Sequence, residues 1–213
     1  MDCAFFNGMF ITAVNATRDI YTSPTGDVWT QHILALPFVP SNNNAVLGTG
    51  ADGDGVPMVL IATNSSIARS YDGLVWTGCV GATNTDVTKI AFNTSTRTWI
   101  VVGMSSEIYR STDGYRFFSI KNKLPASYTS TPTPLYDVDT NNTLGWVVAG
   151  GVFGTHGGSF VQSNDNGDTW AVLGGTVPTG WNYPGGVVYN SLDQKWCFGI
   201  LGNVDHRGVL MCT

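Results

Sequence analysis

The amino-acid sequence predicts an all-β fold, and three observations lead to this prediction. Only 12% of the 213 residues are charged and 12% are aromatic, which excludes a disordered chain, because disordered chains are rich in charge and poor in aromatic residues. The acidic residues are fourteen Asp and one Glu, Glu107, and Asp favours turns whereas Glu favours helix surfaces. Short β-branched runs bounded by Gly, Asn, Asp or Thr recur along the chain, and no window keeps a helical period free of Gly and Pro. We therefore expect strands joined by turns throughout.

A short motif recurs four times and defines a repeat. Its pattern is Ser-x-Asp-(x)-Gly-x-x-aromatic, and its serines, Ser23, Ser70, Ser111 and Ser163, lie 47, 41 and 52 residues apart. A period in the forties is typical of a four-stranded propeller blade. The motif residues are Ser23, Gly26 and Trp29; Ser70, Asp72, Gly73 and Trp76; Ser111, Asp113, Gly114 and Phe117; and Ser163, Asp165, Gly167 and Trp170.

The motif is expected to close a turn. An Asp in a tight turn accepts hydrogen bonds from backbone N–H groups that would otherwise be unpaired, and Gly supplies the positive φ that the turn needs. The aromatic residue begins the next strand and is expected to pack against the following unit. In the first copy Thr25 replaces the Asp, and we expect Asp27 to substitute for it in part. We interpret the motif as structural, without ligand contact.

The flanks of the motif predict the strands of each unit. Strand c directly precedes the motif, as in residues 107–110, strand b precedes strand c, as in 99–103, and a shorter strand a comes first, as in 89–93. Strand d follows the motif. We predict a single β-propeller domain over residues 1–213, with five blades of four antiparallel strands. The repeat units are about 2–40, 41–84, 85–126, 127–178 and 179–213.

The last unit is expected to lack its outer strand. Residues 186–190, 195–200 and 208–213 correspond to strands a, b and c, and the chain ends where the fifth motif would begin. Three arrangements are open: a five-bladed ring whose last blade has three strands, a blade completed by another chain, and a part of a larger propeller. We favour the first. The open edge of the last blade would then be available for a homo- or hetero-oligomer.

These motifs resemble the Asp-box, or BNR, repeat of β-propellers, which occurs in sialidases and in many non-catalytic propellers. The resemblance covers essentially the whole chain. It implies that ligands bind at the face opposite the Asp-box turns, which the b–c loops and the d–a connections form. Trp and Tyr on that face are expected to be exposed and would suit sugar rings or protein hot spots. The alternatives are that Trp181 and Tyr183 only cover the blade tops and that residues 205–207 form a solvated hairpin loop. The candidate ligand-binding residues there are Arg18, Asp19, Glu107, Tyr128, His156, Trp181, Tyr183, Asp205, His206 and Arg207.

The resemblance also allows a test for catalysis. Sialidases use an arginine triad, a Tyr with a Glu partner, an Asp acid and an Arg-Ile-Pro motif. Here no Arg-Ile-Pro occurs, Glu107 is the only Glu, and most of the six arginines fall in expected strands or a–b turns. We therefore predict no catalytic residue and a binding or assembly module that recognises a glycan or protein surface. The alternatives are a glycoside hydrolase that uses two Asp residues and a purely structural subunit.

No metal site and no cofactor are predicted. Residues 52–55 and 137–141 offer oxygen ligands, and the second segment opens like an EF-hand loop. However, Asn142 and Val148 stand where that loop requires Gly and Glu. We interpret both segments as polar a–b turns.

The four cysteines, Cys3, Cys79, Cys197 and Cys212, show no zinc-site spacing. We expect them to be buried small hydrophobic residues, and a disulfide between Cys197 and Cys212 is left open.

The charge and the hydropathy pattern restrict the partners and the compartment. A net charge of −5 with only ten Lys and Arg residues argues against a basic face for nucleic acid. No run of 18 apolar residues predicts a membrane span, and the N-terminus lacks the pattern of a signal peptide. The low Lys content and the Thr-, Asn- and Gly-rich composition resemble those of extracellular or virion-surface propellers, such as phage or viral attachment proteins. We expect a glycan or protein partner in such a setting.

Overall fold

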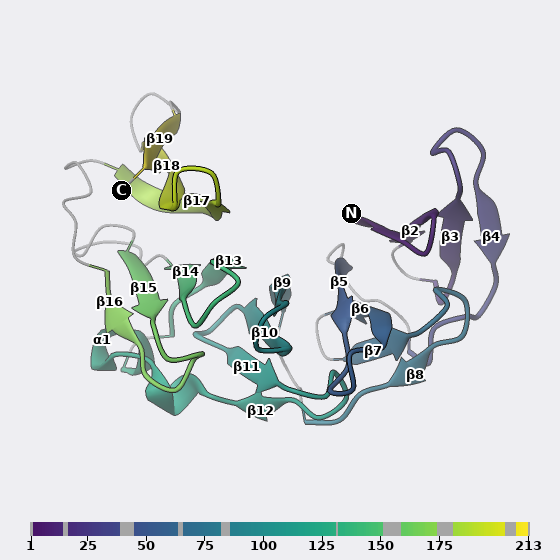
Figure 1. Cartoon of the computed structure of the whole chain (residues 1–213), viewed down its shortest axis with the longest axis horizontal. Coiled ribbons are helices and arrows are strands. Elements are labelled where there is room, and N and C mark those ends of the chain that lie inside the picture. The colour runs from purple at the N-terminus through teal and green to yellow at the C-terminus, as the bar shows by residue number, and fades with distance from the viewer. Residues whose placement is uncertain are drawn as a thin grey trace.

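The computed structural model consists of five antiparallel sheets that follow one another along the chain (Figure 1). It describes residues 2–14, 17–38, 45–63, 66–81, 86–130, 132–150, 159–173, 181–202 and 208–212. The first sheet contains β1 (Cys3–Phe6), β2 (Met9–Ala13), β3 (Ile20–Ser23) and β4 (Thr30–His32). The second contains β5 (Val46–Ala51), β6 (Pro57–Ala62), β7 (Ile67–Ser70) and β8 (Thr77–Gly78). The third contains β9 (Val87–Asn93), β10 (Thr98–Gly103), β11 (Ile108–Ser111) and β12 (Phe118–Ser119).

The last two sheets continue this plan. The fourth contains β13 (Leu135–Thr140), β14 (Trp146–Gly150), β15 (Ser159–Ser163) and β16 (Ala171–Val172). The fifth contains β17 (Trp181–Asn190), β18 (Lys195–Gly202) and β19 (Gly208–Cys212). Two short helices, η1 (Lys121–Lys123) and α1 (Ala126–Thr129), lie between the third and fourth sheets. The all-β class, the four-stranded unit and the three-stranded last unit are as predicted.

The sheets are arranged side by side in an arc (Figure 1). The first strand of each sheet, here called its inner strand, lies next to the inner strand of the following sheet: β1 by β5, β5 by β9, β9 by β13 and β13 by β17. The short outer strands, such as β8 and β12, lie on the convex side. In the described residues no buried cluster joins the fifth sheet to the first, so closure into a ring stays a prediction.

The core lies between successive sheets rather than at one centre. Four buried clusters each combine side chains of two neighbouring sheets. Strand β10 shows why its sequence is a continuous apolar run: Trp99 and Val101 face the second sheet, while Ile100 and Val102 face the fourth. A strand with both faces buried needs apolar residues at every position. Strand β10 therefore lacks the alternation of apolar and polar residues that a strand with one exposed face shows.

The motif aromatics pack in the direction opposite to the expected one. Trp76 belongs to the cluster between the first and second sheets, Phe117 to that between the second and third, and Trp170 to that between the third and fourth. Each therefore covers the preceding sheet, not the following one. Trp29, on the first sheet, has no such cover and is 38% exposed.

The motif closes a hydrogen-bonded turn in all four copies. The serine Oγ accepts the N–H of the motif glycine at 2.8–2.9 Å, as in Ser70 with Gly73 and Ser111 with Gly114. The carboxylate of Asp113 accepts the next two free N–H groups, at 2.8 and 2.7 Å. We call these segments the Ser-Asp-Gly turns.

In the first of these turns the expected role of Asp27 is wrong. Thr25 Oγ1 accepts the N–H of Asp27 at 3.3 Å, so the threonine hydroxyl supplies one acceptor in place of the missing carboxylate. The side chain of Asp27 is exposed and accepts no hydrogen bond in the described part of the chain. In the other turns the carboxylate stands before the turn glycine and accepts the N–H groups that follow it, whereas Asp27 follows Gly26 and itself carries the first of these N–H groups.

Two turn glycines differ in what surrounds them, and this gives a matched pair of substitutions. Gly26 and Gly114 both have positive φ, +89° and +63°. A Cβ on Gly26 would meet nothing closer than the Phe10 ring at 3.9 Å, whereas one on Gly114 would overlap Met58 Cε and lie 2.9 Å from its sulfur. Met58 is fully buried. We expect Gly26→Ala to cost about 1 kcal/mol of strain and Gly114→Ala about 2–4 kcal/mol in urea unfolding. Equal losses would contradict this packing.

The cysteines divide into one pair and two free thiols. Cys197 and Cys212 face each other across β18 and β19 and form a disulfide. Cys79 is free and partly buried, and burial raises the pKa of its thiol to about 12. Cys3 is free and exposed, so its expected burial is wrong. Its strand, β1, is the inner strand of the first sheet and presents this side chain to solvent.

Candidate functional site

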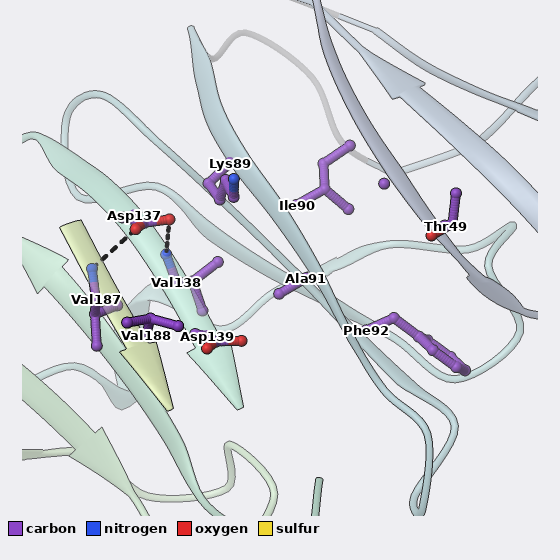
Figure 2. A pocket seen from close by; sticks show the side chains of 11 residues that line it. Thr49, Lys89, Ile90, Ala91, Phe92, Asp137, Val138, Asp139, Val187 and Val188 are labelled. Carbon is purple, nitrogen blue, oxygen red and sulfur yellow. Dashed lines mark hydrogen bonds between the residues drawn. The ribbon is translucent and has the colours of Figure 1, made fainter. Parts of the chain in front are cut away.

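A cavity of about 370 Å³ lies where four inner strands converge (Figure 2). Strands β5, β9, β13 and β17 each contribute to it. We call it the axial cavity. Its polar side chains are Thr49, Lys89, Asp137 and Asp139, and its apolar lining includes the ring of Phe92. Opposite charges and an aromatic ring therefore border one open cavity.

Asp137 and Asp139 point from β13 towards the neighbouring inner strand β17. The Val187 N–H donates to Asp137 Oδ2 at 2.9 Å, and the Tyr189 N–H donates to Asp139 Oδ2 at 2.8 Å. Residues two apart lie on the same side of a strand. The two carboxylates therefore reach the N–H groups of Val187 and Tyr189, which are also two residues apart and point to the same edge of β17. They serve as acceptors for the edge of β17 that pairs with no other strand in the described part of the chain.

The same contact recurs in the first sheet. Asp2 Oδ2 accepts the N–H of Leu47 on β5 at 3.0 Å. By strand register, Asp2, Lys89 and Asp137 occupy corresponding places in the first, third and fourth sheets. In each of these sheets the motif serine pairs with a residue of the second strand, and that residue pairs with a residue of the inner strand. Asp2, Lys89 and Asp137 each stand three residues before this inner-strand residue. In the third sheet a cation therefore stands where two other sheets have a carboxylate.

Lys89 cannot accept a hydrogen bond, and the N–H group at the matching place on the next inner strand has another acceptor. The N–H of Val138, on the strand that Lys89 faces, donates instead to Oδ1 of its neighbour Asp137 at 3.0 Å (Figure 2). The ammonium of Lys89 makes no hydrogen bond and no ion pair among the described residues. Lys89 is half-buried at the rim of the axial cavity.

Burial sets the ionisation of the two axial carboxyls. It raises the pKa of Asp137 and of Asp139 above the ordinary value, although the N–H donors of β17 and the charge of Lys89 act in the opposite direction. The turn carboxyls behave in the opposite way. In Asp165 burial also acts to raise the pKa, but the hydroxyl and N–H of Thr169 and the hydroxyl of Ser163 outweigh it and lower the pKa to about 2.

These opposite shifts predict a stability maximum on the acid side of neutrality. The raised pKa of Asp137 and Asp139 means that their contribution is present below pH 3.8 and lost as pH rises through the folded-state pKa. The lowered pKa of Asp165 means that its contribution is present above pH 3.8 and lost as pH falls towards about 2. Urea midpoints measured across this pH range check both effects. Asp165→Asn should reduce the fall in stability at low pH, here called the acid limb, and Asp137→Asn should reduce the fall as pH rises. Asp27→Asn is the control, and an unchanged acid limb in Asp165→Asn would contradict the assignment.

A second cavity of about 600 Å³ adjoins the first at the a–b turn end of the inner strands. It shares Thr49 and Phe92 with the axial cavity. Its lining also includes Arg97 and Asn142, from the a–b turns of the third and fourth sheets, and Phe5 of β1. The axial cavity therefore adjoins a second hollow at the end of the inner strands that also carries the Ser-Asp-Gly turns.

The residues predicted on the opposite face are only partly brought together. Arg18 is exposed, and Asp19 is buried, where it accepts the side-chain N–H of Gln31 at 2.9 Å and the N–H of Leu34 at 3.0 Å. Glu107 pairs with Lys121 Nζ at 2.9 Å and accepts the Tyr109 hydroxyl at 3.0 Å.

The expected exposure of Tyr128 is wrong. Tyr128 is 1% exposed and belongs to the cluster between the third and fourth sheets. The connection that was expected to be an open loop folds into η1 and α1, and α1 turns the ring inwards against Gly150. A Cβ on Gly150 would lie 2.7 Å from the Tyr128 ring, so the glycine leaves room for it.

The other candidates cannot be placed in the site. His156, Asp205, His206 and Arg207 lie outside the described residues. Trp181 and Tyr183 lie within β17, but their side chains fall outside the described part.

The axial residues were not among the candidate residues predicted from the sequence. Asp137 and Asp139 were expected in an a–b turn, but both lie inside β13, and the turn begins after Thr140. The alternation Asp-Val-Asp is a period of two, which is the signature of a strand with both carboxylates on one side. Among the described residues no group of three or more His, Cys, Asp or Glu side chains is placed to hold a metal ion. In the same part of the chain no helix is long and apolar enough to cross a membrane.

Comparison with known proteins places the fold. No family model matches the chain, and no curated protein matches its sequence. Solved structures do match. A GH74 xyloglucanase from Xanthomonas campestris has a TM-score of 0.69 at 12% identity, and the match covers 95% of this chain. The extracellular domain of the hybrid two-component system BT4673 from B. thetaiotaomicron has a TM-score of 0.63 at 10% identity over 98% of it.

YCF48 from Cyanidioschyzon merolae matches 97% of the chain with a TM-score of 0.56 at 17% identity. These neighbours are β-propeller proteins. The fold is a β-propeller. The five sheets are its blades, and at these identities the likeness concerns the fold alone. The chain spans 34% of the xyloglucanase chain, 26% of the BT4673 domain and 66% of YCF48.

Proposed function

We propose that the chain is a non-catalytic Asp-box propeller that acts as a binding or assembly module and recognises a glycan or protein surface. The observation that carries this is that Glu107, Asp137 and Asp139 all bond to groups of the scaffold. Glu107, the only Glu, is held by Lys121 and Tyr109. Asp137 and Asp139 each accept backbone N–H groups of the next blade. Acids and bases that hold a scaffold together are poorly placed to exchange protons with a substrate.

The links between neighbouring blades support a binding role. Arg110 Nη1 lies 2.8 Å from Asp168 Oδ1 of the fourth blade, and Arg97 Nη1 donates to the Gly53 carbonyl of the second at 2.9 Å. Such contacts fix the blades relative to one another on the turn face. A rigid scaffold with variable loops is the usual architecture of a recognition module.

The disulfide supports a virion, phage or cell-surface setting. Disulfides form and persist in oxidising compartments and are rare in the cytosol. The Cys197–Cys212 bridge would therefore fit a protein that works outside the cell or on a particle surface. The hydrogen bonds of the Ser-Asp-Gly turns support the assignment to Asp-box propellers.

Binding and turnover assays distinguish the proposal from its enzymatic alternative. The labelled protein is applied to a glycan array that includes xyloglucan fragments, and the same preparation is incubated with fluorogenic glycosides. We expect binding without turnover. Turnover that is lost in Glu107→Gln or Asp139→Asn would instead establish a glycoside hydrolase. The absence of both binding and turnover would contradict a glycan-binding role.

Assembly through the last blade is a second candidate. In the described residues β19 is hydrogen-bonded to β18 alone, so its other edge is open to a strand from another chain. Light scattering across a range of protein concentrations tests this. A strict monomer at the highest concentration would contradict self-assembly through this edge.

A further inference from the structure

We propose that the axial cavity binds a neutral saccharide unit of one or two rings, held by Lys89, Asp139 and Phe92. The inference rests on the proposed binding function and assigns it a site and a ligand class. The site differs from the predicted loop face, because its opening lies towards the Ser-Asp-Gly turns.

The charge of Lys89 favours ionised Asp137 and Asp139, but its ammonium makes no hydrogen bond and no ion pair among the described residues. At the corresponding places Asp2 and Asp137 accept N–H groups of the next blade, at 3.0 and 2.9 Å. Lys89 cannot do this, and Val138, the N–H that it would have to serve, is satisfied by Asp137. Its ammonium therefore keeps three donors for a ligand.

Asp139 supplies an acceptor beside this donor. One of its oxygens accepts the Tyr189 N–H at 2.8 Å, which fixes the carboxylate in place. The backbone N–H of Thr140 also acts on this carboxylate, whose two oxygens keep further lone pairs for a ligand at the cavity. The corresponding residues in the first three blades are Ala4, Gly48 and Ala91. The fourth blade thus adds a carboxylate that the repeat does not require.

The mixed charges select against charged ligands. The Lys89 ammonium repels a cation, and the Asp137 and Asp139 carboxylates repel an anion, whereas hydroxyl groups can accept from the first and donate to the second. Phe92 is partly exposed at the cavity, with Trp99 packed against it at a centroid distance of 4.6 Å. An aromatic ring of this kind offers an apolar surface for the C–H face of a sugar.

The size of the cavity agrees with a small ligand. Its volume of about 370 Å³ is near the lower end of small-molecule sites, which span roughly 300–1,000 Å³. The adjoining cavity of about 600 Å³ would give a ligand access from the turn face. We therefore expect one or two rings inside and any longer glycan to leave along this opening.

Saturation-transfer NMR on the full chain tests the site. The probes are glucose, N-acetylglucosamine, lactose and cellobiose, with N-acetylneuraminic acid as the anionic comparison and Nα-acetyl-lysine amide as the cationic one. The variants are Lys89→Met, which keeps the aliphatic stem, and Asp139→Asn, whose amide oxygen can still accept the Tyr189 N–H. Lys123→Met, on exposed η1, is the matched control. We expect a neutral probe to bind and both cavity variants to weaken it about tenfold or more, with the control unchanged.

Each outcome decides the proposal. Neutral-saccharide binding that persists in both variants would overturn the axial site and leave the binding function standing. Absence of binding by any neutral probe, with a native circular-dichroism spectrum, would overturn the ligand class. Stronger binding of the lysine amide would also overturn it, because the cavity would then fit a basic side chain of a protein partner.

Discussion

Replacing Trp146 by alanine is expected to lower the free energy of unfolding by about 3–5 kcal/mol. Trp146 is fully buried on β14, in the cluster between the third and fourth blades. Removal of its ring would leave a cavity that β14 cannot move to close, because β14 is hydrogen-bonded to β13 on one side and to β15 on the other. Packing between these two blades would be lost together with the buried area.

The same substitution removes a polar link between the blades. Trp146 Nε1 donates to Asn166 Oδ1 at 3.1 Å, and Asn166 Nδ2 donates to the Thr98 hydroxyl of the third blade at 2.9 Å. The Thr96 hydroxyl also donates to Asn166 Oδ1, at 3.0 Å. Trp146→Phe keeps most of the ring but not the donor, and we expect it to cost about 1–2 kcal/mol. The two variants together separate packing from hydrogen bonding.

Equilibrium urea unfolding followed by far-UV circular dichroism measures these losses. Trp29→Ala is the matched control, because Trp29 is partly exposed on the first blade and donates only to its own turn carbonyl. We expect it to cost about 1 kcal/mol. Losses of similar size at both tryptophans would contradict the interpretation that the core lies between the blades.

The repeat made most of the fold predictable from the sequence. Local turn chemistry is legible because the acceptor and the groups that it serves are close in the chain, as in Asp113 with the N–H groups of Tyr115 and Arg116. Four copies in phase then give the strand order and the three-stranded last blade. Features that depend on contacts with neighbouring blades could not be predicted from the sequence. The sequence does not show on which side Trp76 packs, or that Tyr128 is buried.

The candidate site was missed for a related reason. The segment that contains Asp137 and Asp139 was interpreted as a turn. Carboxylates at alternate positions occur both in cation-binding loops and along one side of a strand, so their spacing does not distinguish the two. Only the approach of β17 shows that the N–H groups of Val187 and Tyr189 need these acceptors. That Lys89 occupies the place of a carboxylate becomes visible only once strand register aligns the blades. Contacts between segments about 50 residues apart are set by the fold, not by local pattern.

Removing the Cys197–Cys212 bridge is expected to destabilise the last blade by about 3 kcal/mol, the chain-entropy value for a closed loop of about 15 residues. The two cysteines are 15 residues apart and join β18 to β19 directly across the ladder. The double variant Cys197→Ala, Cys212→Ala avoids leaving a hydroxyl at position 197, which is buried. Cys3→Ala is the control, because its thiol is free and exposed.

The loss should be local, because among the described residues the last blade shares a buried cluster with the fourth blade alone. Hydrogen exchange should therefore accelerate in β18 of the double variant while β10, which is buried on both faces, keeps its protection. A thiol reductant added to the native protein should also accelerate exchange in β18, whereas the Cys3→Ala variant should leave it unchanged. Exchange that accelerates equally in β18 and β10 would show that the blades unfold as one unit, and unchanged exchange on reduction would contradict a stabilising role for the bridge.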